Sequence, residues 1–199
     1  VRYHNLFGYH EDERKQVKIV FSGLPKNTIV VADHIDGRIR VVDSSESSIL
    51  LGFVASVQME VTGRTPQSGF LGVLSRASAL SDYPLIVRDN QSIVMADWYN
   101  EQTDHLLLME GSDKGAGRVI IDHTNAAFTN DIATRVNDYR GILAQIGGIH
   151  GQAHKENVRN IVLSEQSDID IYLLANMYWH KAPAVTGGNG RKHILGNSI

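Results

Sequence analysis

The sequence contains no cysteine, so disulfide bonds, thiolate metal sites and a cysteine nucleophile are all excluded. It also lacks any run of about 18 apolar residues, the length that a membrane-spanning helix needs. Neither sign of charge dominates, because 19 lysines and arginines stand against 22 aspartates and glutamates. A net charge of -3 gives no support for a nucleic-acid partner. We therefore expect neither nucleic-acid binding nor insertion into a membrane.

The chain does have enough apolar material for one folded domain. Its 199 residues are 42% hydrophobic and 21% charged, which is typical of a protein with one sizeable core. We assign residues 1–180 to a single domain and predict that residues 181–199, which become glycine-rich and polar, form a linker-like tail. The first residues resemble neither a translation start nor a signal peptide. We expect the domain to be part of a longer chain.

Helical periodicity is almost absent, and short runs rich in valine and isoleucine take its place. The runs end in Gly, Asp, Asn or Ser, as strands do. Val94, Leu107 and Ile120 follow one another at equal intervals along the chain, which favours strands stacked on like strands. The polar stretch 122–138 is expected to be one long loop. The best helix candidate is 171–179, which fits a last strand with a cap equally well.

Two folds are compatible with strands at this spacing. One is an all-β, right-handed parallel β-helix (a solenoid) of about six to eight coils, and the alternative is an antiparallel β-sandwich. Asn-Gly turns, which an antiparallel meander uses at its hairpins, are scarce, and the polar intervals vary in length while the apolar runs do not. The β-helix is therefore the predicted fold. It also predicts ladders of stacked side-chain amides, for which the candidates are Asn125, Asn130 and Asn137.

One segment carries a resemblance to a known group of proteins. The run IVMADWYNEQTDHLLLMEGSDKGAGRVIID, with a D-W-Y-x-E turn at 97–101, alternates apolar strands with polar turns. In this texture, residues 48–174 resemble the pectin-lyase-like right-handed parallel β-helix superfamily, which includes polysaccharide lyases, glycoside hydrolases and phage tailspikes. The resemblance implies that the chain handles an extracellular polysaccharide. Such helices usually have many coils, so the chain would form a portion of one.

The turn that follows Ala96 is the sharpest candidate site. Its aromatic rings could stack on pyranose rings, and its carboxylates could bind hydroxyl groups or act as a catalytic pair. If each step from Val94 to Leu107 to Ile120 is one coil, Glu110 and then His123 lie one and two coils beyond this turn. The predicted catalytic acids are Asp97, Glu101 and Glu110. The predicted substrate-binding residues are Trp98, Tyr99, His105 and His123. The alternative is structural: acids at corners cap backbone groups, and the aromatic pair covers a sheet or a subunit interface.

No metal site is predicted. His150 and His154 are four positions apart, but the glycines around them argue against the helix that would place both on one face. Glu165, Asp168 and Asp170 carry the oxygen ligands that calcium prefers, yet no glycine-centred loop surrounds them, and a solvated strand edge is the simpler interpretation. Calcium would be expected only in a lyase of the families that the chain resembles.

Two functions from different classes fit these features. The first is a polysaccharide-binding domain, extracellular or at a cell or virion surface, with lyase or hydrolase activity as an open alternative. The second is a non-catalytic structural module of a tail fibre, an adhesin or a self-assembling filament. The continuous apolar runs 106–109 and 48–51 motivate the second, because they offer more apolar surface than one core face needs, and homo-oligomers cover such surfaces.

Overall fold

The structure is a computed structural model. It describes residues 2–4, 18–25, 27–33, 35–42, 48–51, 54–62, 68–71, 74–75, 83, 85–96, 99–103, 105–113, 115–123, 125–128, 132–151, 160–178 and 184–197. Within these ranges every helix or strand is a β-strand, which confirms the all-β class. In the same ranges there is no helix whose length and apolar character would let it cross a membrane.

The strands form three sheets, and the described pairings within them are parallel. The nine-stranded sheet contains, in order, β1 (Arg2–His4), β3 (Ile29–Asp33), β5 (Ser48–Leu51), β7 (Ser68–Leu71), β10 (Ile93–Ala96), β13 (Gly117–Asp122), β16 (Arg140–Ile146), β19 (Asp168–Leu174) and β22 (Lys192–Leu195). The eight-stranded sheet contains β2 (Lys18–Ser22), β4 (Ile35–Val42), β6 (Val54–Thr62), β9 (Leu85–Arg88), β12 (Leu107–Glu110), β15 (Ile132–Asn137), β18 (Asn160–Leu163) and β21 (Val185–Thr186). The five-stranded sheet contains β20 (Met177–Tyr178), β17 (Ile149–Gly151), β14 (Asn125–Phe128), β11 (Tyr99–Thr103) and β8 (Leu74–Ser75).

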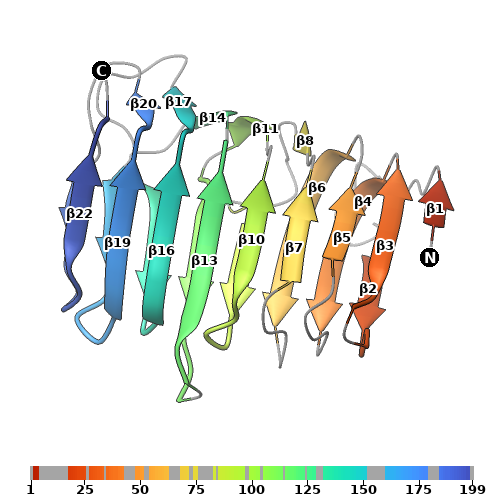
Figure 1. Cartoon of the computed structure of the whole chain (residues 1–199), viewed down its shortest axis with the longest axis horizontal. Coiled ribbons are helices and arrows are strands. Elements are labelled where there is room, and N and C mark those ends of the chain that lie inside the picture. The colour runs from red at the N-terminus through yellow and green to blue at the C-terminus, as the bar shows by residue number, and fades with distance from the viewer. Residues whose placement is uncertain are drawn as a thin grey trace.

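Successive strands enter the three sheets in a fixed rotation. From β8 onward the chain passes through the five-, eight- and nine-stranded sheets in turn, and each strand pairs with the strand three places later. The described strands from β2 to β7 alternate between the two larger sheets. Figure 1 shows the nine-stranded sheet extending along the longest axis of the molecule, with β1 and β22 at its opposite ends. Parallel pairing throughout the described strands overturns the antiparallel sandwich.

One strand from each sheet, taken in succession along the chain, makes what is here called a level. Val94 in β10 pairs with Ile120 in β13, and Ile120 pairs with Ala144 in β16. Leu107 lies in the eight-stranded sheet, where it pairs with Leu85 and Thr134. The step from Val94 to Leu107 therefore joins strands of different sheets. The interval between paired strands of the same sheet, from Val94 to Ile120, is twice as long. The nine strands of the largest sheet also exceed the six to eight turns expected.

The core consists of columns of aliphatic side chains that stack from level to level. In β13 and β19 buried residues alternate with more exposed ones, as expected when one face of a strand packs inward. Val119, Leu143 and Ile171 occupy the same register position on three neighbouring strands, and all three are completely buried. Burying each such side chain contributes about 1.5–3 kcal/mol to folding.

Two secondary-structure expectations are wrong in the described residues. The stretch 122–138 contains β14 and β15 instead of one loop, because strand pairing on both sides buries even modestly apolar side chains such as Ala133. The helix candidate 171–179 contains the end of β19, a turn and β20. Ala175 makes that turn with a positive φ of 52°. The alternative of a last strand with a cap is right about the strand, but β20, β21 and β22 follow it.

The corner between the nine-stranded and five-stranded sheets repeats a backbone turn. His123, Gly147, Ala175 and Gly196 all have φ between 49° and 64°. The backbone N–H of each of the first three donates to a carbonyl of the next level, at 2.9–3.0 Å.

Asparagines stack at this corner, as the ladder prediction requires, but they are different asparagines. Asn176 is buried, its Nδ2 donates to the Gln145 carbonyl at 2.8 Å, and its backbone N–H donates to Oδ1 of Asn197 at 2.8 Å. Of the three expected asparagines, Asn130 lies outside the described residues, and Asn125 and Asn137 lie within strands.

The expected tail is part of the sheets. β21 pairs with β18 and β22 pairs with β19, so residues 184–197 do not form a linker. Gly187 and Gly188, which suggested flexibility, have φ of 79° and 64° and pack against Leu163. Glycine is needed at both positions because the backbone there has a positive φ and packs closely against Leu163. The resulting glycine-rich composition resembles that of a linker.

Candidate binding groove

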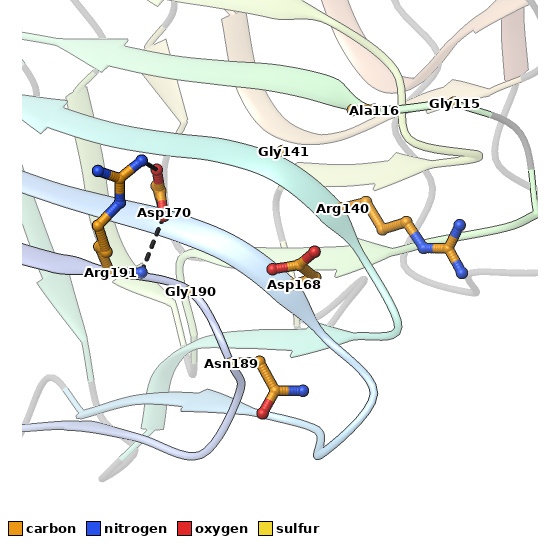
Figure 2. Close-up of a pocket in the computed structure, with 9 residues that line it drawn as sticks. All are labelled: Gly115, Ala116, Arg140, Gly141, Asp168, Asp170, Asn189, Gly190 and Arg191. Atoms are coloured by element: carbon orange, nitrogen blue, oxygen red, sulfur yellow. Dashed lines mark hydrogen bonds and ion pairs between the residues drawn. The ribbon is translucent and has the colours of Figure 1, made fainter.

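A groove of about 700 Å³ lies where the eight-stranded sheet passes into the nine-stranded sheet. Its residues come from the beginnings of β13, β16, β19 and β22, and so from four successive levels (Figure 2). The described residues that line it are Gly115, Ala116, Arg140, Gly141, Asp168, Asp170, Asn189, Gly190 and Arg191. All of them are either small or polar, and none is aromatic.

Asp170 and Arg191 form an internal pair at one end of the groove. The backbone N–H of Arg191 donates to Oδ1 of Asp170 at 2.8 Å, and its Nη2 lies 3.4 Å from Oδ2 (Figure 2). The Asp170 side chain is 24% exposed, whereas that of Arg191 is 79% exposed. The pair therefore neutralises this carboxylate and holds the start of β22 against β19.

Arg140 and Asp168 remain as a second, unpaired couple of charges. They are register partners at the starts of β16 and β19, and both are exposed. The Arg140 guanidinium nevertheless extends away from Asp168 (Figure 2). Neither side chain forms an ion pair with another described residue. Their charged ends are therefore available to a ligand.

Backbone hydrogen bonds fix the base of both side chains. The N–H of Arg140 donates to Oδ1 of Asn90 at 3.0 Å, and the N–H of Asp168 donates to the Tyr139 carbonyl at 3.0 Å. Asn90 is itself buried, and its Nδ2 donates to the Ser112 carbonyl at 2.7 Å. The two charged residues thus extend from a wall that is ordered before any ligand binds.

Tyr139 forms the interior of this wall. Its ring is completely buried, and its hydroxyl donates to the Gln91 carbonyl. Burial raises the pKa of Tyr139 far above the usual value for tyrosine, because the charged phenolate would lose its hydration. Tyr139 therefore stays neutral and acts as a structural support for the groove.

Glycines keep the floor of the groove low. Gly141 has a φ of 124°, and a Cβ at this position would collide with the Gly117 carbonyl. A Cβ at Gly190 would collide with the Ile169 carbonyl. Neither position can carry a side chain without moving a neighbouring strand, so glycine is needed at both for the strands that line the groove to pack this closely.

An aromatic pair lies next to the groove. The Tyr172 ring stacks on the His193 ring with centroids 4.5 Å apart and planes 9° from parallel. Tyr172 follows Asp170 by two positions in β19, so both point to the same face of the strand. The sequence indicates this shared face, since Asp168, Asp170 and Tyr172 alternate with isoleucines. The two aspartates were nevertheless interpreted as part of a solvated strand edge.

The turn that the sequence singled out lies mostly beyond what the structure describes. Asp97 and Trp98 are outside the described residues, and of Tyr99 and Glu101 only the backbone, in β11, is described. The strand ends on either side of the turn are at the corner between the nine-stranded and five-stranded sheets. The groove lies at the other end of the nine-stranded sheet's strands, so the two candidate sites are separate surfaces.

The other candidate residues lie in, or next to, strands of different sheets. Glu101 belongs to the five-stranded sheet, whereas Glu110 belongs to the eight-stranded sheet and forms an ion pair with Arg88 in β9. His123 directly follows a strand of the nine-stranded sheet. These three residues were expected on one side of the molecule because the step from Val94 to Leu107 was taken for a full coil.

The two candidate histidines differ in their surroundings. His105 is buried, stacks on Tyr83 with ring centroids 4.3 Å apart, and donates from Nδ1 to the Ile132 carbonyl. The His123 side chain is 68% exposed, and its Nδ1 lies 2.8 Å from Oδ1 of Asp122. Of the two, only His123 is accessible to a large ligand.

Among the described residues, no three His, Asp or Glu side chains come together as metal ligands. Asp170, one of the acids considered for calcium, is bound to Arg191, and the Glu165 carbonyl accepts a hydrogen bond from Asn189 at 3.0 Å. His150 lies in β17, where only its backbone is described, and His154 is outside the described residues.

Comparison with known proteins identifies no relative. The chain matches no protein-family model, and no curated protein and no solved structure matches it. Its function is therefore inferred from its own residues.

Proposed function

We propose that the chain is a right-handed parallel β-helix domain of the pectin-lyase-like kind that binds an extracellular polysaccharide. The rotation of strands through three parallel sheets supports a coil, since a chain that visits the sheets in constant order winds around a common core. Connections between parallel strands of one sheet are right-handed in about 98% of cases, which supports a right-handed coil. The observation that carries the binding function is the groove, because four successive levels contribute its polar lining.

The dimensions and chemistry of the groove suit a linear polymer. Adjacent parallel strands lie about 4.8 Å apart, so the lining from the first to the fourth level spans roughly 14 Å, enough for several sugar residues. Asp and Asn side chains accept hydrogen bonds from hydroxyl groups, and Arg donates to them. The Tyr172–His193 stack next to the groove adds an aromatic surface of the kind that packs against pyranose rings.

Binding without catalysis is the simpler function. Glu101 and Glu110 belong to strands of different sheets, which does not favour a catalytic pair. Catalysis by Asp97, Glu101 and Glu110, as a lyase or a hydrolase, stays a prediction for activity assays on the polysaccharides that bind. The same holds for calcium as a cofactor. Secretion, or display on a cell or virion surface, is part of the proposal because that is where such polymers are found.

A polysaccharide array tests the proposal, with the mass of the purified chain in solution measured on the same sample. Arg140→Ala and Asp168→Ala should each weaken binding about tenfold or more, equivalent to roughly 1.4 kcal/mol. Neither should change the melting temperature by much, because both side chains are exposed.

Two further variants distinguish the groove from the turn that the sequence singled out. Trp98→Ala and His123→Ala remove an aromatic ring and an exposed imidazole from that region. If the groove is the site, both should bind the polysaccharide as the unaltered chain does. Loss of binding in these two variants, with normal binding in the groove variants, would transfer the proposal to the turn.

A structural module of a filament, adhesin or tail fibre is the second candidate, and exposed apolar side chains favour it. Leu195, Ile194 and Met177 are 65%, 46% and 48% exposed, and they lie on β22 and β20, the last strands of their sheets. Such an edge can pair with another chain. In this case the mass in solution should rise with concentration, and Leu195→Asp should suppress the rise. A constant monomer mass would eliminate this candidate.

A further inference from the structure

We infer that the groove selects a neutral, hydroxyl-rich polysaccharide over a carboxylated or sulfated one. This inference rests on the proposed binding function and adds the chemical class of the ligand. It follows from the charges of the described lining residues and from their hydrogen-bonding capacity.

The formal charges of the described lining residues cancel. Two arginines stand against two aspartates, and one couple, Asp170 with Arg191, is already paired internally. The remaining couple, Arg140 and Asp168, starts from register positions on adjacent strands, about 4.8 Å apart. An anion attracted by Arg140 therefore meets an opposing carboxylate on the adjacent strand, and the described lining as a whole offers it no net positive charge.

The hydrogen-bonding groups also require donors from the ligand. The Asp168 carboxylate can only accept hydrogen bonds. Nδ2 of Asn189 donates one of its two hydrogens to the Glu165 carbonyl at 3.0 Å, and Oδ1 of the same amide is a further acceptor. A carboxylate or sulfate group supplies acceptors alone, so it cannot donate to the Asp168 carboxylate or to Oδ1 of Asn189. A hydroxyl group donates and accepts, so the hydroxyls of an uncharged polymer can donate to Asp168 at one point of the groove and accept from Arg140 at another.

The test compares two polymers with the same backbone. An uncharged glucan or mannan that binds the chain is partly oxidised at its primary hydroxyls to carboxylates, and both forms are titrated calorimetrically at low and at high salt. The uncharged form should bind about tenfold more tightly or better. Its Kd should change by less than roughly twofold with salt, because no net charge is neutralised on binding.

Asp168→Asn is the matched variant. It keeps a side chain of the same shape but removes the charge that repels anions, so the preference for the uncharged polymer should shrink while the melting temperature stays the same. Tighter binding of the oxidised polymer, with an affinity that falls as salt rises, would overturn the inference and leave the proposed function standing. If no polymer binds, charged or uncharged, the proposed function itself fails.

Discussion

Thr134 places a hydroxyl group in an otherwise apolar column. It lies between Leu107 and Ile161 on neighbouring strands and is completely buried. Its Oγ1 has no hydrogen-bond partner among the described residues. Leaving a buried hydroxyl unsatisfied costs about 1–3 kcal/mol. Thr134→Val should therefore raise the free energy of unfolding, by about 1 kcal/mol or more in urea denaturation.

Ser167 provides the matched control for this prediction. It is equally buried, but its Oγ donates to the Val136 carbonyl at 3.3 Å. Ser167→Ala should lower the free energy of unfolding, because it leaves that carbonyl without this donor. A loss of stability in Thr134→Val as well would mean that the Thr134 hydroxyl has a favourable interaction.

Tyr139 makes the free energy of unfolding depend on pH in the alkaline range. The pKa of its phenol is raised by burial, whereas in the unfolded chain it is about 10. Above that pH the unfolded state loses a proton that the folded state retains, so stability is present in full below about pH 10 and declines as the pH rises further. Denaturation curves should show a steeper decline above pH 10 for the unaltered chain than for Tyr139→Phe. Equal declines would show that Tyr139 does not contribute.

At the scale of single elements, the last strand tests whether the C-terminal segment is structural. β22 pairs with β19 over four register positions, from Ile171 with Lys192 to Leu174 with Leu195. Removing residues 184–199 would expose Ile161, Ile171 and Leu173, all now buried. The loss of stability should be on the order of 3–5 kcal/mol, measured by thermal or urea denaturation. Removing only residues 198–199 is the control, and a linker would show no loss in either case.

Strands with strong apolar alternation could be predicted from the sequence, and others could not. β13 and β19 were evident because each is a short run rich in Val, Ile or Leu bounded by polar residues. β15 was missed because its buried residues include Ala133 and Thr134, which become buried only when neighbouring strands pair on both sides. Parallel pairing joins residues that are far apart in the chain, and a local pattern does not contain that information.

The candidate site was harder to predict than the strands. The groove gathers residues from Gly115 to Arg191, which only the three-dimensional stacking brings together. Asp168 and Asp170 were considered only as calcium ligands or as part of a solvated strand edge, and Arg140 and Asn189 gave no signal of their own. The equal spacing of the apolar runs also led to a wrong position for Glu110 relative to Glu101, because a step between strands of different sheets was taken for a step from one level to the next.

At the scale of the whole molecule, stability should vary along the axis. Each level pairs only with its two neighbours, so unfolding can begin at an end and proceed inward. The amides of Ile171 and Ala175, which donate to carbonyls in or next to β22, should exchange with solvent faster than those of Leu106 and Gly111, which donate to interior levels. The exchange rates of these four amides, measured by NMR, test whether stability varies along the axis. Identical rates at all four amides would indicate that the chain opens as one unit.

The interval between levels has a consequence for how such a protein can change over generations. Val94, Ile120 and Ala144 occupy one position on three levels, at nearly equal intervals along the chain. An in-frame duplication of one such segment would add one level and lengthen the groove by about 4.8 Å. The existing positions would keep their chemistry, while the copied one could diverge. If the groove binds a polymer as proposed, the length of polymer recognised is a heritable quantity that grows in discrete steps, independently of what each step recognises.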